Sequence, residues 1–175
     1  MNRFIKMNQS AGDLLALGIY PNAKEVTESW AALHAVEHKL KANLKDPSMT
    51  VVAVGDGRSP RTASLFAFHS KWNCISIDPR LNTDKIPIWE TAIQRLKCIS
   101  STVEEVSLSF DKVIIVAVHS HAPLPKILDH ITANVRSMVA IPCCVSYNHT
   151  IPPSIEYEDA GIWSPENIVK IWRSI

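Results

Sequence analysis

The segment from Thr50 to Asp78 contains, in order, the parts of a site for a nucleoside cofactor. An apolar β-branched run leads into Gly55 and Gly57, a helix is predicted from Pro60 onward, and Asp78 ends a second apolar run. Glycines at a strand end can adopt positive φ and allow a ligand close to the backbone. The helix start directs free N–H groups at the turn, and a carboxylate roughly 20 residues further on can accept both ribose hydroxyls. The order indicates a βαβ unit that binds an adenosine-containing cofactor. The alternative is an ordinary tight turn between strand and helix, with Asp78 as a solvated strand end.

Polar side chains follow in and around this turn. Asp56 lies between the two glycines, where its carboxylate can contact a ligand or bond the backbone of its own turn. The hydroxyl of Ser59 is placed to cap the predicted helix. The guanidinium groups of Arg58, Arg61 and Arg80 can clamp a cofactor carboxylate or a phosphate. Alternatively, these arginines are solvated cations at a helix start or turn and bind no ligand.

Two histidines follow the most apolar run of the chain, residues 112–118. If the backbone stays extended, His119 and His121 point to the same side, where either imidazole can act as a base near neutral pH. They can also bind metal, with Cys144 and His149 as further ligands. The spacing is no recognised zinc signature, so we predict no metal site. The remaining interpretation is that of loop histidines bonded to backbone carbonyls.

Strand and helix patterns alternate along the chain. Helices are predicted at 10–17, 23–44, from Pro60 to a last turn at His69, 87–96, 101–109 and 123–135. Strands are predicted at 51–54, 74–77, 97–100, 112–118 and 137–145, then two short ones near 155–157 and 168–172. This predicts an α/β fold with a three-layer α/β/α doubly wound, mostly parallel sheet and an N-terminal helical segment. We expect one domain: N-terminal helices in 1–48, a βαβ core in 49–146, and closing strands or a tail in 147–175. A cation is favoured at His69, at a helix end.

The composition is that of a soluble globular protein. The 175 residues carry a formal net charge of +1, so neither a nucleic-acid nor a membrane partner is indicated. The N-terminus lacks the apolar stretch of a secretory signal. Four cysteines lie in apolar, strand-like runs and are predicted to be buried reduced thiols, which favours a cytoplasmic location. Cys143 and Cys144 are adjacent and, on a strand, would point to opposite faces.

From about Glu25 to Val145 the chain resembles the class I S-adenosylmethionine-dependent methyltransferases, whose fold is Rossmann-type. The matching pieces are VVAVGDG as the glycine motif, SID as the second-strand acid, and VIIVAVHSHAP as the fourth strand with its loop. The resemblance implies S-adenosylmethionine as cofactor, with ribose on Asp78 and with His119 or His121 as the catalytic base beside the glycines. The implied cofactor-binding residues are Gly55, Asp56, Gly57, Arg58, Ser59, Asp78 and Arg80.

The chain departs from the family pattern at three places. Ala53 stands where the family usually has an acid, and Ser59 stands where a third glycine is usual. The loop from His119 to Pro123 replaces the Asn/Asp-Pro-Pro-aromatic loop of amino-methylating members. We therefore predict a methyltransferase-like protein that transfers a methyl group to an unidentified substrate. Two alternatives stay open: a catalytically inactive scaffold or partner subunit, as an oligomer, or an NAD(P)- or nucleotide-binding protein. Whether the protein is an enzyme is left open.

Overall fold

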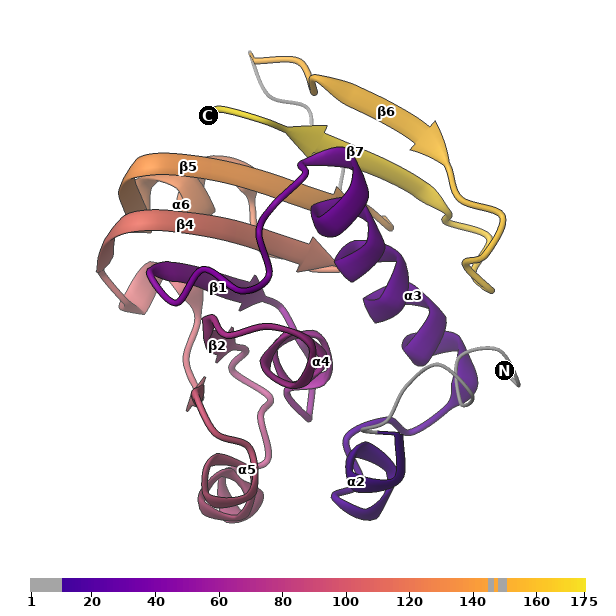
Figure 1. Cartoon of the computed structure of the whole chain (residues 1–175), viewed down its shortest axis with the longest axis vertical. Helices are drawn as coiled ribbons and strands as arrows, with labels where there is room; N and C mark the ends of the chain where they lie inside the picture. Colours follow the sequence, from indigo (N-terminus) through magenta and orange to yellow (C-terminus); the bar gives the residue numbers. More distant parts are fainter. Residues whose placement is uncertain (1–10, 145–146, 148–150) are drawn as a thin grey trace.

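A seven-stranded sheet forms the centre of the molecule in the computed structural model, which describes residues 11–144, 147 and 151–175 (Figure 1). Its order is β3-β2-β1-β4-β5-β7-β6. The first five strands are parallel, while β7 runs antiparallel to both β5 and β6. The bounds are β1 Met49–Val54, β2 Asn73–Ile77, β3 Leu96–Ile99, β4 Leu108–Val118, β5 Ile131–Ile141, β6 Ile155–Glu158 and β7 Ile168–Trp172. The prediction of a doubly wound, mostly parallel sheet closed by two short strands is confirmed.

Helices cover both faces of this sheet (Figure 1). The α-helices are α2 Ala11–Ala16, α3 Ala23–His34, α4 Arg61–His69, α5 Ile86–Ala92 and α6 Leu124–His130. Side chains of β1 alternate between two cores: Val51 and Ala53 pack with α2, α3 and α4, whereas Val52 and Val54 pack with α6. Because a strand buried on both faces must be apolar throughout, continuous runs such as that of β4 take central positions. Among the helices of the described residues, none has the length and hydrophobicity to cross a membrane.

The predicted helix over 23–44 is shorter in the structure. The Asn22 side chain accepts a hydrogen bond from the Glu25 backbone and caps the start of α3. After His34 the chain continues as one turn of π-helix, Ala35–Lys39, and Lys41 has a φ of +56°. A left-handed residue cannot continue a right-handed helix. The prediction that the helix continues to residue 44, which followed the spacing of the apolar residues, is therefore wrong.

The boundary between α6 and β5 also differs from the prediction. Residues 131–135 were expected in a helix, but β5 begins at Ile131 and pairs with β4 from Leu108 onward. Thr132 and Val135 are β-branched and suit an extended backbone. At the other end β5 stops at Ile141, before Pro142, so the two adjacent cysteines follow the strand and are not part of it.

His69, in the last turn of α4, is half-buried against Trp30, with the two ring centroids 5.4 Å apart. Burial lowers the pKa of its imidazole below the usual 6.5, although the charge of Glu37 acts in the opposite direction. Burial therefore opposes the positive charge that the helix end favours at His69.

This burial makes a prediction about pH. As the pH falls through 6.5, the unfolded chain takes up a proton before the folded chain does, so the free energy of unfolding decreases. In a His69→Gln variant the decrease between about pH 7.5 and about pH 5 should be smaller than in the unmodified protein. Urea denaturation at each pH measures this, with exposed His34→Gln as the control for loss of an imidazole. Identical pH profiles for His69→Gln and the unmodified protein would contradict the assignment.

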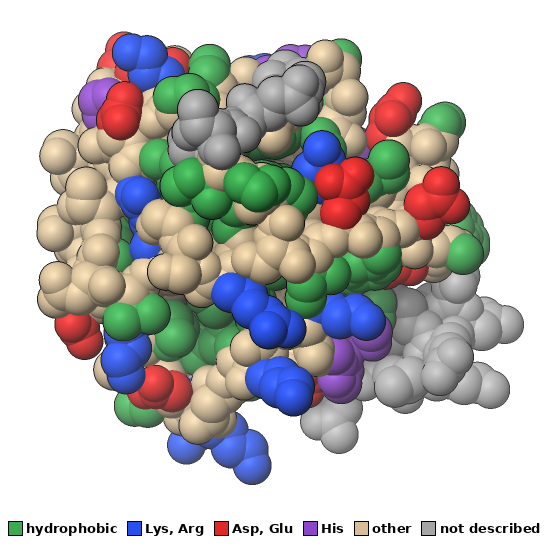
Figure 2. Space-filling view, turned by 90° about the horizontal axis from the view of Figure 1, so that it is seen from above, with side chains coloured by type: hydrophobic (Ala, Val, Ile, Leu, Met, Phe, Trp, Pro, Cys, Tyr) green, Lys and Arg blue, Asp and Glu red, His purple; other side chains and the backbone are tan. Residues whose placement is uncertain are grey.

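Charged side chains of both signs share the surface. Figure 2 shows Lys and Arg side chains gathered toward the lower centre of one face, next to a histidine, with Asp and Glu side chains elsewhere on it.

Candidate functional site

A cavity of about 380 Å³ lies at the carboxyl ends of β1, β2, β3 and β4. The strand order reverses at β1: the sheet continues through β2 to β3 on one side of β1 and through β4 to β5 on the other. Ligands of open α/β sheets bind at such a point of reversal. The cavity is lined by residues that follow each of the four strands, among them Gly55, Asp78, Arg80, Ser101, Thr102, Ser120 and His121.

Asp78 connects the end of β2 to the glycine turn. One carboxylate oxygen, Oδ2, accepts a hydrogen bond from the Gly57 backbone N–H at 2.7 Å. The other, Oδ1, accepts from the backbone and the Nε of Arg80, at 2.8 and 3.3 Å. The side chain is only 3% exposed, yet the residue lines the cavity. Because each carboxylate oxygen has two lone pairs and Oδ1 already accepts twice, Asp78 keeps capacity for one further donor at Oδ2.

Gly55 and Gly57 have φ values of +74° and +89°, as the turn was predicted to require. The reasons for the two glycines differ. A Cβ on Gly55 would lie 2.3 Å from the Oγ and 2.9 Å from the Cα of Ser120, so the loop after β4 packs directly on the turn after β1. A Cβ on Gly57 would meet the guanidinium of Arg61 at 2.7 Å. The space beside Gly55 is therefore filled by the protein's own Ser120 and is not left for a ligand.

Asp56 holds the start of α4. Its Oδ1 accepts from the Thr62 backbone N–H at 2.8 Å, and its Oδ2 accepts from the Ala63 N–H at 3.1 Å and from the Ser76 hydroxyl at 3.0 Å. Burial raises the pKa of Asp56, while the Arg61 guanidinium and the backbone donors oppose that shift. Of its two sequence-based interpretations, the structure places Asp56 in the turn, with both oxygens engaged inside the protein.

The predicted cap by Ser59 is wrong. Its hydroxyl donates to the Ile19 carbonyl at 2.5 Å and so joins the glycine turn to the segment after α2. The orphan N–H groups of Thr62 and Ala63, in the first turn of α4, are satisfied by Asp56 instead. Asp56 lies six residues before Thr62 and seven before Ala63, and it reaches both N–H groups because the intervening turn folds back. Sequence spacing alone does not reveal such a cap.

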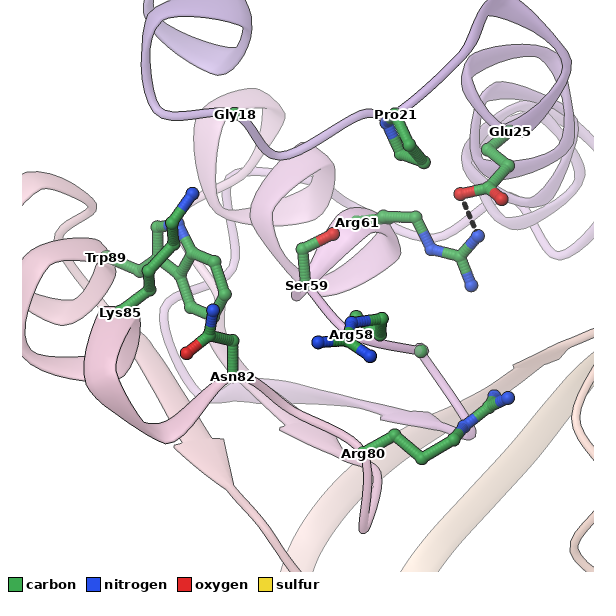
Figure 3. Close-up of a pocket in the computed structure, with 11 residues that line it drawn as sticks. Gly18, Pro21, Glu25, Arg58, Ser59, Arg61, Arg80, Asn82, Lys85 and Trp89 are labelled. Carbon is green, nitrogen blue, oxygen red and sulfur yellow. Dashed lines mark ion pairs between the residues drawn. The ribbon is translucent and has the colours of Figure 1, made fainter.

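A second cavity of about 380 Å³ lies beside the first, on the side of α2 and α5 (Figure 3). Its basic lining residues are Arg58, Arg61, Arg80 and Lys85. Arg61 forms an ion pair with Glu25, drawn as a dashed line in Figure 3. Arg58 is exposed, and Arg80 borders both cavities with a side chain that is 68% exposed. Two of the three predicted arginines can therefore reach a ligand at this end of the sheet.

His119 and His121 point in different directions, which corrects the expectation that they share a side. His119 has a φ of +49°, so the chain turns where extension was assumed. Its ring lies between α3 and the segment before β7, with Nδ1 3.5 Å from the buried carboxylate of Glu28 and Nε2 3.3 Å from the Glu166 carbonyl. The side chain of His121 is exposed and lines the first cavity. His149, considered above as a further ligand, lies outside the described residues.

The cysteines divide into two kinds. Cys74 and Cys98 are buried as predicted, and burial raises the pKa of each thiol to about 12. Cys143 is half-buried and Cys144 is exposed, so the prediction of burial is wrong for this pair. The prediction of opposite faces is wrong as well, because their Sγ atoms lie 3.6 Å apart beyond the end of β5. The hydrogen bond to Cys143 is the main cause that raises the pKa of Cys144.

Comparison with solved structures identifies the fold. Neither a protein-family model nor a curated protein matches the sequence. A SAM-dependent methyltransferase from Aquifex aeolicus matches with a TM-score of 0.50 and 16% identity, over 77% of this chain and 74% of that one. A mutant of MtNAS matches with a TM-score of 0.53 and 9% identity, over 98% of this chain and 75% of that one.

Coclaurine N-methyltransferase, in a structure bound to N-methylheliamine and SAH, has a TM-score of 0.44 and 11% identity over 64% of this chain. The match spans 35% of that enzyme's length. The strand order, the antiparallel strand β7 between β5 and β6, and the matches at TM-scores of 0.50 and 0.53 agree with one another. The chain has a class I methyltransferase-like fold, in a divergent form.

Proposed function

We propose that the protein binds S-adenosylmethionine in the cavity at the carboxyl ends of β1, β2, β3 and β4, and that it transfers the methyl group to a substrate. The observation that carries this proposal is the position of Asp78. It directly follows β2, lines the cavity and accepts a hydrogen bond from the Gly57 N–H of the glycine turn. A cavity of about 380 Å³ is within the roughly 300–1,000 Å³ range of small-molecule sites.

The adenosine half of the cofactor suits the residues that line this cavity. Asp78 can accept one ribose hydroxyl at the Oδ2 lone pair that Gly57 leaves free, and the second at Oδ1 when the exposed Arg80 side chain turns its Nε–H away. The loop after β3 supplies the opposite wall, with the hydroxyls of Ser101 and Thr102 and the apolar side chain of Val103. Such a wall of apolar surface with a few polar groups can hold a purine ring.

The methionine half requires a partner for its carboxylate. Arg61 is engaged by Glu25, whereas Arg80 is exposed at the border of both cavities and Arg58 is exposed at the second cavity. A guanidinium binds a carboxylate through two parallel hydrogen bonds. Arg80 borders both cavities, and we assign it to the carboxylate, with Arg58 as the second cation.

The bound cofactor supplies an electrophilic methyl group to a nucleophile, and the protein's part is to position the two. His121 borders the cavity with an exposed imidazole and can take a proton from the incoming substrate. The His119 ring is held between Glu28 and the Glu166 carbonyl, so we assign it to positioning the loop after β4.

The second candidate function is that of a methyltransferase-like scaffold without catalysis. The feature that favours it is the contact between Gly55 and Ser120, which fills space beside the first glycine of the turn. A site closed in this way has less room for a ligand against the backbone. This candidate predicts a folded protein that binds no cofactor.

Isothermal titration calorimetry separates these functions. Reduced, folded protein is titrated with S-adenosylmethionine, S-adenosylhomocysteine, NAD, NADP and ATP in turn. The proposal predicts binding of the two sulfur ligands with a dissociation constant in the micromolar range, and none of the other three. No heat with any of the five would overturn the proposal in favour of the scaffold. Binding of only NAD, NADP or ATP would overturn it in favour of a nucleotide-binding protein.

A further inference from the structure

We propose that His121, Cys143 and Cys144 form a binding site for a thiophilic divalent cation, with Zn²⁺ as the best fit. Neighbouring loops supply the three side chains. His121 follows β4, and the two cysteines follow β5. These strands are parallel partners in register up to Val118 and Ile141, and the His119 N–H donates to the Ile141 carbonyl at 2.8 Å. The two loops therefore leave the sheet side by side.

The ligand atoms are already spaced much as a tetrahedral zinc site requires. Zn–S bonds are about 2.3 Å long and Zn–N bonds about 2.05 Å. In a regular tetrahedron these lengths place two sulfurs about 3.8 Å apart, and a sulfur and a nitrogen about 3.6 Å apart. The observed distances are 3.6 Å between the two Sγ atoms and 3.4 Å from Cys144 Sγ to His121 Nε2. All three atoms lie within 4.8 Å of one another. The third edge, between Cys143 Sγ and the His121 nitrogen, is at most 4.8 Å long and has to shorten to about 3.6 Å when the ion binds.

The loops that carry these ligands are tied together by buried contacts. Tyr147, 2% exposed, lies shortly after the cysteines, and its hydroxyl donates to the Ser120 carbonyl at 3.1 Å. Ser120 is itself 1% exposed and packs against Gly55, while the Cys143 thiol contacts the His119 carbonyl at 3.8 Å. Because both loops are anchored, the ligand atoms meet with little further loss of conformational entropy on binding.

The donor set selects the class of ion. Two thiolates and an imidazole favour zinc and other thiophilic metals, whereas Mg²⁺ and Ca²⁺ require oxygen ligands, which these three side chains do not supply. Three protein ligands leave the fourth position open, which is the arrangement of catalytic rather than structural zinc sites. The separation of 3.6 Å between the sulfurs is far longer than the bond of about 2.03–2.05 Å in a disulfide, so both thiols are available.

The site borders the cavity assigned above to S-adenosylmethionine, because His121 belongs to both. If that function holds, the ion takes over the task of His121: a metal-bound imidazole cannot accept a proton, but the ion lowers the pKa of a hydroxyl or thiol bound at its open position. Only this consequence rests on the proposed function. Binding of the ion alone does not depend on it.

Titration with Co²⁺ and Zn²⁺ tests the site. Reduced protein is stripped of metal by a chelator and titrated with Co²⁺, whose visible absorption reports tetrahedral coordination and whose near-ultraviolet charge transfer reports thiolate ligands; Zn²⁺ then displaces it. We expect one ion per chain. Cys143→Ser, Cys144→Ser and His121→Asn should each weaken the binding at least about 10-fold.

Two control variants keep the test specific. Cys98→Ala removes a thiol outside the cluster, and His34→Asn removes a histidine whose ring lies 4.3 Å from that of His38, where an imidazole-only site could compete. Neither control should change the affinity. The proposal is overturned if the folded, reduced protein binds no Co²⁺ or Zn²⁺, if Cys143→Ser with Cys144→Ser leaves binding intact, or if the Co²⁺ complex lacks the charge-transfer band. Calorimetry with S-adenosylhomocysteine on the same metal-free protein tests the cofactor separately.

Discussion

Replacing Gly55 with alanine should lower the free energy of unfolding by about 3 kcal/mol, since a strained backbone costs about 1–3 kcal/mol and overpacking adds a similar amount. The backbone φ of +74° is unfavourable for any residue with a Cβ. The new methyl group would also lie 2.3 Å from the Oγ and 2.9 Å from the Cα of Ser120. Neither the backbone of Ser120 nor that of Gly55 can move without separating the loops after β1 and β4.

Two other glycines give matched comparisons for this variant. Gly12 lies in α2, and no described atom outside its own helix lies within 4 Å of the place a Cβ would take, so Gly12→Ala should stabilise the protein by up to about 1 kcal/mol. Gly57→Ala should fall between the two, because the atom it meets is a side-chain atom of Arg61 and not backbone, although Glu25 holds that guanidinium in place. Urea denaturation followed by circular dichroism measures all three. A Gly55→Ala variant within about 0.5 kcal/mol of the unmodified protein would show that the contact with Ser120 is absent in solution.

Replacing Asp78 with asparagine should weaken the affinity for S-adenosylhomocysteine about 10- to 100-fold, because hydrogen bonds to a charged group contribute about 1.5–3 kcal/mol each. The asparagine side chain carries no charge, and its NH₂ group would face the N–H of either Gly57 or Arg80. Both of these N–H groups donate to Asp78, so one of them would lose its acceptor. The same change should lower the free energy of unfolding by about 1 kcal/mol. Calorimetry on the variant gives the first quantity, and urea denaturation gives the second.

The control for this prediction is Asp84→Asn. Asp84 is exposed and does not line either cavity, so the substitution makes the same chemical change away from the site. Its affinity should match that of the unmodified protein. If folded Asp78→Asn bound S-adenosylhomocysteine as tightly as Asp84→Asn does, Asp78 would have no role in holding the ribose.

The sheet and the first part of the site were predictable because local patterns determine them. The continuous apolar run of β4 indicates a central strand, and the order of Gly55, Gly57 and Asp78 brings the two strand ends together in any right-handed βαβ unit. The end of α3 was not predictable, since apolar residues after Lys41 keep a helical spacing while the backbone leaves the helix.

The contacts that differ from the predictions depend on residues far apart in sequence. The packing of Ser120 on Gly55 is decided by how closely two loops approach, and no spacing in the sequence reports that distance. The divergence of His119 and His121 follows from one left-handed residue. Cys143 and Cys144 come together because β5 ends at Ile141; the one signal that could have indicated this is Pro142, which cannot donate to a strand ladder.

The most direct test of the cofactor site is to map amide chemical-shift changes by NMR as S-adenosylhomocysteine is added. If the cofactor binds in the first cavity, the largest changes should fall on the residues that line it, namely Gly55, Asp78, Thr102, Val103 and Ala122. Changes confined to Gly18, Lys85 and Trp89, which line the second cavity, would contradict it and move the ligand to the far side of the glycine turn. Saturating ligand with no change at either set would show that this methyltransferase-like fold does not bind the cofactor.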